Sequence, residues 1–117
     1  MNGCHKNDLL SAMMLIVIVA CAANNGSFDM INEAAETISS ATVTVSGQTI
    51  AFGDIRQGGQ VTGRYRVRFD DDFTISIVFE SGRKLEKSLG YVTNGFDYSH
   101  RFMVSDNDIK VVESNAR

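Results

Sequence analysis

The sequence predicts an all-β protein, a small antiparallel β-sandwich of seven or eight short strands. After Ala41, apolar and polar residues alternate with a period of two through most of the chain, which is typical of strands with one buried face. Turn residues separate these segments every eight to twelve residues or so, the spacing seen in sandwiches and small barrels. With 117 residues the chain is long enough for one domain and no more.

A strand pair is predicted between GRYRVRF, residues 63–69, and FTISIVF, residues 73–79. Folding the chain about Asp71 places Val67 opposite Ile75 on one face, with matching neighbours on either side. We therefore expect a hairpin whose buried face holds Tyr65, Val67, Phe69, Phe73, Ile75 and Ile77, and whose solvated face holds Arg64, Arg66 and Arg68 opposite Val78, Ser76 and Thr74.

The other strands follow from the same alternation and from turn residues between them. Val43 and Val45 share one face of a strand that turns at Gly47, and Asn94-Gly95 is the best two-residue hairpin turn in the chain. The remaining expected strands and turns, in chain order, are TIAFGDI, the turn RQGGQ, the turn ESGRK around Gly82, the strand KLEKSLGYVT, the strand FDYSHRFMV, the turn SDND and the strand IKVVE.

The segment FDMINEAAETISSA, residues 28–41, admits two interpretations. Phe28, Ile31, Ala35 and Ile38 lie at helical spacing, which predicts a short amphipathic helix. Alternatively, residues 27–32 form an edge strand and the next four residues turn the chain into a second strand.

The N-terminal segment indicates export. LLSAMMLIVIVA, residues 9–20, has no charge and is too short for the roughly 20 apolar residues that span a bilayer, but it has the length of a signal-peptide hydrophobic region. Ile18-Val19-Ala20-Cys21 resembles the bacterial lipobox, and this resemblance implies that the Cys21 thiol is diacylated, that the leader is cut off before Cys21, and that the new amino terminus is acylated as well. A short uncleaved anchor and a buried apolar segment are the alternatives.

A lipobox divides the chain into three parts. Residues 1–20 would be the signal peptide, residues 21–30 the acylated cysteine and a flexible tether that includes AANNGS, and residues 31–117 the sandwich. Because Cys4 lies in the leader, the mature domain has no cysteine pair for a disulfide. We expect a lipid-anchored protein of the bacterial cell envelope, on the periplasmic face of the outer membrane.

The order ETISSATVTVSG, FGDIRQGG, GRYRVRF, FTISIVFESGRK, LGYVTNG and IKVVE resembles small bacterial envelope lipoproteins that contain one immunoglobulin-like β-sandwich. The resemblance covers residues 31–113 and consists of turn glycines and alternating apolar residues. It implies an architecture and assigns no activity or functional residue.

Arg64, Arg66 and Arg68 have two interpretations. On an exposed sheet face, arginines keep a protein soluble and prevent sheets from stacking. Alternatively, three guanidiniums spaced about 6 to 7 Å apart along a strand form a surface for an acidic protein or envelope component. Nucleic acid is a poor candidate, because the net charge of −3 provides no basic field.

The sequence shows little that points to catalysis, and we expect neither a cofactor nor a metal. Ser99 and His100 are adjacent in a strand and so point to opposite faces, and one mature histidine does not make a zinc site. We expect His100 to be hydrogen-bonded and half-buried.

Two acidic turns and one tyrosine complete the candidates. Asp70-Asp71-Asp72 and Asp106-Asn107-Asp108 suit hairpin tips better than calcium sites. Tyr91 is expected to be a corner tyrosine bonded to backbone, with exposed recognition as the alternative.

These observations predict a non-enzymatic, lipid-anchored binding or structural module of the cell envelope. The alternative is an inhibitor or immunity-type lipoprotein that blocks one enzyme or toxin, for which a small domain with an arginine-rich face is suitable.

Overall fold

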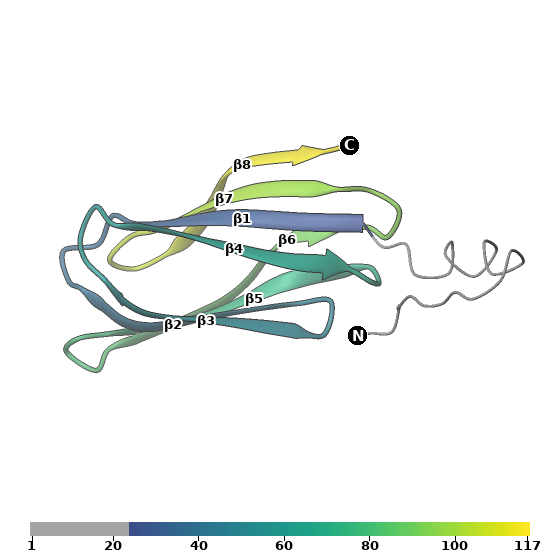
Figure 1. The fold of residues 1–117 in the computed structure, drawn as a ribbon. Coiled ribbons are helices and arrows are strands. Elements are labelled where there is room, and N and C mark those ends of the chain that lie inside the picture. Colours follow the sequence, from purple (N-terminus) through teal and green to yellow (C-terminus); the bar gives the residue numbers. More distant parts are fainter. Residues whose placement is uncertain (1–23) are drawn as a thin grey trace, which may run out of the picture.

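The computed structural model describes residues 24–117, which form two packed four-stranded sheets (Figure 1). Sheet A has the strand order β4-β1-β7-β8, and sheet B has the order β3-β2-β5-β6. The predicted all-β sandwich is confirmed, with one parallel pairing, between β1 and β7. The strands are β1 (Asn24–Asn32), β2 (Ile38–Val45), β3 (Gln48–Ile55), β4 (Gln60–Val67), β5 (Asp71–Phe79), β6 (Lys84–Val92), β7 (Tyr98–Val104) and β8 (Ile109–Ala116).

Three of the predicted turns join strands of the same sheet. Hairpins connect β2 to β3, β5 to β6 and β7 to β8. In the first hairpin, Ser46 and Gly47 have φ of 48° and 75°, the left-handed pair that a tight two-residue hairpin requires. The turn chemistry read from the sequence is therefore confirmed at these three positions.

The predicted hairpin between residues 63–69 and 73–79 is wrong. β4 pairs with β1 in sheet A, whereas β5 pairs with β2 and β6 in sheet B. Residues 68–70 carry the chain from one sheet to the other. Because both sheets of a sandwich turn their apolar faces toward the same core, the alternation is identical for a hairpin and for a crossing.

Two further predictions, for Asn94-Gly95 and for Phe69, are wrong because both lie in loops that cross between the sheets. Asn94-Gly95 is not a hairpin turn, because it joins β6 of sheet B to β7 of sheet A. Phe69, expected on the buried face, follows the end of β4 and is 50% exposed. In contrast, Val67, Ile75 and Ile77 are buried as predicted.

The N-terminal strand replaces both a predicted helix and much of a predicted tether. β1 covers residues 24–30 of the expected tether, and it lies between β4 and β7 rather than at an edge. Phe28 and Met30 alternate on its buried face, while Ile31 points to the other side. Phe28 and Ile31, which lie at helical spacing, therefore point to opposite faces of a strand. Of the two alternatives the strand was the better one, although the strand is central and not at an edge. The sandwich begins at residue 24 instead of 31, and Cys21 and the predicted signal peptide lie outside the described residues.

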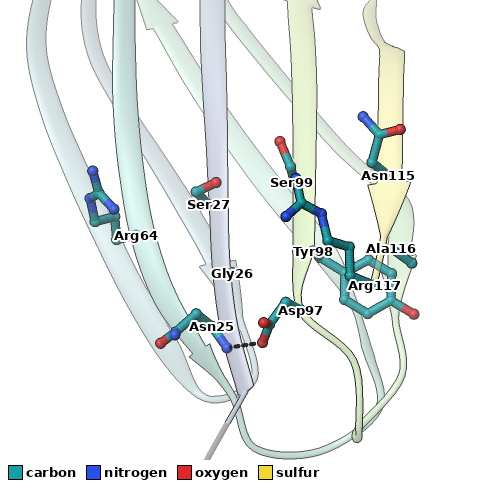
Figure 2. Close-up of a pocket in the computed structure, with 10 residues that line it drawn as sticks. All are labelled: Asn25, Gly26, Ser27, Arg64, Asp97, Tyr98, Ser99, Asn115, Ala116 and Arg117. Atoms are coloured by element: carbon teal, nitrogen blue, oxygen red, sulfur yellow. Dashed lines mark hydrogen bonds between the residues drawn. The ribbon is translucent and has the colours of Figure 1, made fainter.

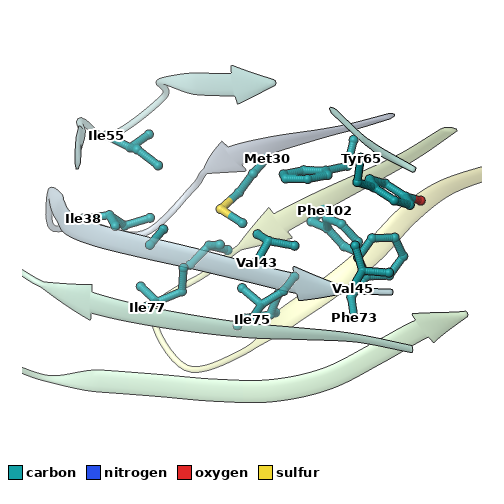
Figure 3. Packing of buried hydrophobic residues seen from close by; sticks show 14 of the residues in the cluster. Met30, Ile38, Val43, Val45, Ile55, Tyr65, Phe73, Ile75, Ile77 and Phe102 are labelled. Atoms are coloured by element: carbon teal, nitrogen blue, oxygen red, sulfur yellow. The ribbon is translucent and has the colours of Figure 1, made fainter. Parts of the chain in front are cut away.

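The core between the sheets is dominated by aromatic rings at one end and aliphatic side chains at the other (Figure 3). The centroid of the Phe73 ring lies 4.9 Å from that of Phe102 and 5.6 Å from that of Tyr65, and both pairs have edge-to-face geometry. Gly26 gives the Tyr65 ring its place, because a Cβ at this position would lie 2.1 Å from the ring.

Asn32 is the polar exception in this core. Its Nδ2 donates to the carbonyl oxygens of Ile55 at 2.8 Å and Glu36 at 2.9 Å, and its Oδ1 accepts from the Ala34 amide at 2.9 Å. The buried amide thus satisfies the backbone where β1 leaves the sheet. No helix long and apolar enough to cross a membrane occurs within residues 24–117.

Candidate functional site

The outer face of sheet A carries an open groove near the start of β1 (Figure 2). Strand register places Arg64 of β4 opposite Ser27 of β1, Ser27 beside Ser99 of β7, and Ser99 opposite Asn115 of β8. The groove has a volume of about 620 Å³. Its lining residues are Asn25, Gly26, Ser27, Arg64, Asp97, Tyr98, Ser99, Asn115, Ala116 and Arg117.

The structure divides the arginine stripe into two parts. Arg64 and Arg66 lie on β4 with exposed side chains on the outer face of sheet A, as predicted. Arg68 lies beyond the end of β4, in the loop that crosses to sheet B. Only Arg64 lines the groove, and Arg66 follows on the same face opposite Asn25.

The guanidiniums of Arg64 and Arg66 make no ion pair with any residue of the 24–117 region, whereas several other cations do. Arg101, on the same outer face, lies 3.6 Å from the Asp29 carboxylate, which also accepts a hydrogen bond from Thr62 at 2.7 Å. Asp29 is thus engaged by Arg101 and Thr62 rather than by the two arginines of β4.

Asp97 is the carboxylate within the groove, and its position is structural. Its Oδ1 accepts from the Asn25 amide at 2.8 Å and from Asn24 Nδ2 at 3.2 Å (Figure 2 shows the first). These hydrogen bonds, with the charge of Arg117, hold the pKa of Asp97 below its usual value. The ionised carboxylate of Asp97 therefore holds the start of β1 in place.

The groove has the chemistry of a binding surface. Ser27, Ser99 and Asn115 supply neutral hydrogen-bonding groups, and Arg64 supplies a charged donor. His100 does not reach Ser99, because it points into the core with an exposed fraction of 3% and rings on three sides: Tyr98, Phe102 and Phe73.

Sequence reasoning expected His100 to be half-buried and hydrogen-bonded. It is fully buried, and its Nδ1 has no hydrogen-bond partner among the described residues. Burial lowers the pKa of His100, so the imidazole is neutral near pH 7. Its surroundings are those of a core residue.

The two acidic turns accept hydrogen bonds from backbone amides, but only residues 106–108 form a hairpin tip as expected, because residues 70–72 lie where the chain crosses from β4 to β5. Asp70 accepts from the Asn94 amide at 2.7 Å, and Asp71 accepts from the Ser46 amide at 2.9 Å. At the opposite end, Asp106 accepts from the Ala35 amide at 2.7 Å. Asp108 binds Lys87 Nζ at 2.8 Å, and this contact and the Ile109 amide lower the pKa of Asp108. In the region from Asn24 to Arg117, no three potential metal-ligating side chains gather.

The corner-tyrosine interpretation of Tyr91 is wrong. Its ring is 55% exposed, and the hydrogen bonds found in residues 24–117 do not include its hydroxyl. The tyrosine that bonds to backbone is Tyr98, whose hydroxyl accepts from the Thr93 amide at 3.1 Å. Both residues lie near the crossing between β6 and β7.

The groove residues other than Arg64 were not found from the sequence. Ser27, Ser99, Asn115 and Arg117 are ordinary surface residues when taken singly, and they come together only through the pairing of β1, β7 and β8. No pattern within one strand identifies such a row.

Comparisons with known proteins show the fold and no family. No family model matches the chain. No curated protein matches either. Among solved structures, an NMR structure of a protein from Eubacterium rectale has a TM-score of 0.60 and 12% identity, over 75% of this chain and 86% of that one. The crystal structure of a "putative cell adhesion protein" from Bacteroides uniformis has a TM-score of 0.51 and 8% identity. That match covers 80% of this chain but 50% of the other, so this chain corresponds to about half of it. At such identities the likeness concerns the fold alone.

Proposed function

We propose that this protein is a non-enzymatic binding module of the bacterial cell envelope, anchored by a lipid at Cys21 and displaying the outer face of sheet A to an acidic partner. The observation that carries the proposal is the pair Arg64 and Arg66, exposed beside the polar groove and without an ion pair in residues 24–117. Guanidinium groups bind carboxylates and phosphates in a two-pronged geometry that lysine does not offer.

The shape of the groove favours an extended acidic ligand. Arg66, Arg64 and Thr62 follow one another along the outer face of β4, and the serines and asparagines of the neighbouring strands lie beside them. A chain of carboxylate groups laid along β4 would meet two cations in succession, with neutral donors alongside. The partner is therefore expected to be an acidic protein or an acidic polymer of the envelope.

Two further observations support an envelope location and a binding role. The run of residues 9–20 before Cys21 has the length and composition of an export signal. The Bacteroides uniformis protein, which shares the fold, carries a cell adhesion description, and adhesion is a non-enzymatic envelope function. Fold alone does not assign function, so the proposal depends on the site.

The test compares the removal of two positive charges beside the groove with the removal of two positive charges at the opposite end of the sandwich. A fluorescent poly-glutamate peptide serves as the carboxylate probe for the purified, folded protein. Arg64→Gln with Arg66→Gln should abolish binding of the probe, and Arg64→Lys with Arg66→Lys should restore part of it. Arg56→Gln with Lys84→Gln removes the same charge at exposed positions of the opposite end and should leave binding unchanged. Binding should weaken steeply with added salt, because exposed charge contacts are screened.

Equal loss of binding in the Arg56 and Lys84 variant would reduce the interaction to net charge and overturn the proposal. The natural partner is then sought by cross-linking in isolated envelopes with the same variants. A single stoichiometric enzyme or toxin lost with the Arg64 and Arg66 variant would favour the inhibitor function over a general binding module.

A further inference from the structure

Exposed large apolar side chains gather at one end of the sandwich. Of the four in residues 24–117, Phe69, Tyr91 and Phe96 lie at the end where β1 begins, and Val112 lies within β8. This end, on the right in Figure 1, also holds the loop from β4 to β5 and the loop from β6 to β7, two of the connections that cross between the sheets. We call the surface formed by Phe69, Tyr91, Phe96 and Arg68 the aromatic end.

The aromatic end is held by internal hydrogen bonds. Asp70 links its own loop to the loop of Phe96 by accepting from the Asn94 amide at 2.7 Å. The Phe69 carbonyl accepts from Ser46 Oγ at 2.8 Å, and the Phe69 ring lies over Gly47, 3.6 Å from where a Cβ would be. The exposed rings therefore lie on loops that internal hydrogen bonds hold in place, and the Asp70 carboxylate is bound to a backbone amide.

The opposite end has a different character. It carries ion pairs between Arg83 and Glu36 and between Lys87 and Asp108, at 3.4 Å and 2.8 Å. None of the four exposed large apolar side chains of the described region lies there. The two ends thus differ in their exposed aromatic side chains, and aromatic side chains are enriched where proteins meet the membrane–water interface.

Cys21, the lipid-anchor residue of the proposed function, lies close in sequence to the aromatic end. Cys21 precedes Asn24, the first residue of β1, by three positions. Three residues span at most about 11 Å, so an acylated Cys21 would hold the start of β1 at the bilayer surface. Because residues 24–30 belong to a central strand, only residues 22 and 23 would separate an acylated Cys21 from the sandwich.

We propose that the aromatic end docks onto the phospholipid bilayer, with Phe69 and Phe96 in the headgroup region and the Arg68 guanidinium on lipid phosphates. The proposal rests on the lipid anchor of the proposed function. Aromatic rings favour the membrane–water interface, and guanidiniums bind phosphate through charge-assisted hydrogen bonds. Docking would fix the sandwich with its strands pointing away from the membrane, and it would place the groove of sheet A, which lies near the start of β1, beside the bilayer surface.

The chain contains no tryptophan, so a single tryptophan reports on one position. Phe69→Trp and Phe96→Trp are introduced into the full chain, purified from membranes and placed in vesicles of phosphatidylethanolamine and phosphatidylglycerol. Val112→Trp is the matched control, because Val112 is 50% exposed, as Phe69 is, but lies within β8. Bromine atoms on the lipid chains should quench the tryptophans at positions 69 and 96 and leave the tryptophan at position 112 bright.

Two readouts separate this inference from the anchor on which it rests. Mass spectrometry of the same samples reports acylation of Cys21. An acylated, vesicle-bound protein whose tryptophans at 69 and 96 are quenched no more than that at 112 would overturn docking while leaving the lipid anchor intact. A chain without lipid at Cys21 would overturn the anchor itself. Circular dichroism of each variant verifies that the sandwich is folded.

Discussion

The side chain of Gln48 hydrogen-bonds to both backbone groups of Arg66. Its Oε1 accepts from the Arg66 amide at 2.9 Å, and its Nε2 donates to the Arg66 carbonyl at 2.7 Å. Gln48 begins β3 at the edge of sheet B, and Arg66 lies in β4 at the edge of sheet A. One amide therefore closes the seam between the sheets and covers backbone groups that a foreign strand could otherwise pair with, in a chain that has no proline to protect its edges.

Removing this amide should destabilise the fold and expose the edge of β4. Gln48→Ala loses the two hydrogen bonds to Arg66 and a third from Nε2 to the Ser46 carbonyl, of about 0.5 to 1.5 kcal/mol each, so the free energy of unfolding should fall by about 1.5 to 4.5 kcal/mol. Gln60→Ala, at an exposed position of β4, should change the free energy of unfolding little. Urea denaturation measures both, and sedimentation velocity reports the self-association expected of Gln48→Ala alone. Equal stability of the two variants would show that the seam does not depend on Gln48.

Gly26 is predicted to be intolerant of any side chain. A Cβ would lie 2.1 Å from the Tyr65 ring, which packs against Phe73 and leaves little room to move. Gly26→Ala should therefore lower the free energy of unfolding by about 1 to 3 kcal/mol through overpacking. Gly53→Ala is the control, because a Cβ there meets nothing within 4 Å. If both variants melt at the same temperature, the ring position over Gly26 is wrong.

His100 should make stability depend on pH below its ordinary pKa. Burial lowers the pKa of His100 from 6.5 in the folded state, so the unfolded chain takes up a proton first as pH falls. The stabilising contribution is complete above pH 6.5 and decreases below it, by at most about 1.4 kcal/mol per pH unit.

The carboxylates with lowered pKa affect stability only at lower pH, below their ordinary values of 4.5 for Glu36 and 3.8 for Asp97 and Asp108. Between pH 7.5 and 5, thermal unfolding should therefore follow His100, and His100→Phe should flatten the dependence. If His100→Phe and the unaltered protein show the same pH dependence of stability, a group other than His100 causes that dependence.

The centre of the core should be the costliest place to lose volume. Ile75 and Ile77 are fully buried between the sheets, so truncating either to Ala should reduce the free energy of unfolding by about 2 to 5 kcal/mol. Val112→Ala, at a half-exposed position, should cost much less. Chemical denaturation gives the ranking, and a mild effect at both isoleucines would contradict the packing.

Strand existence and core facing were predictable because a period of two follows directly from the pleat. Val43, Val45, Val67, Ile75 and Ile77 all face the core as the alternation requires. Sheet membership was not predictable, since residues 68–70 and 93–97 cross between sheets where short loops suggested hairpins. The alternation reports which face is buried and not which strand is the neighbour.

β1 was predicted only as the second of two alternatives, because its apolar pattern is interrupted at the residue that holds the strand in place. Asn32 occupies a core position of the strand, and its polar side chain breaks the apolar alternation begun by Phe28 and Met30. Its three hydrogen bonds exist only in the folded structure. The arginines of β4 were found from the sequence, whereas the groove beside them depends on three strands that are distant along the chain.

The intact mass of the protein purified from membranes is the most direct test of the claim that this sandwich is a lipid-anchored envelope module. The unaltered protein should begin at Cys21 and carry the added mass of acyl chains, and Cys21→Ser should keep residues 1–20 and carry none. A protein that retains its first 20 residues, or that begins elsewhere with a free thiol at Cys21, would contradict the account.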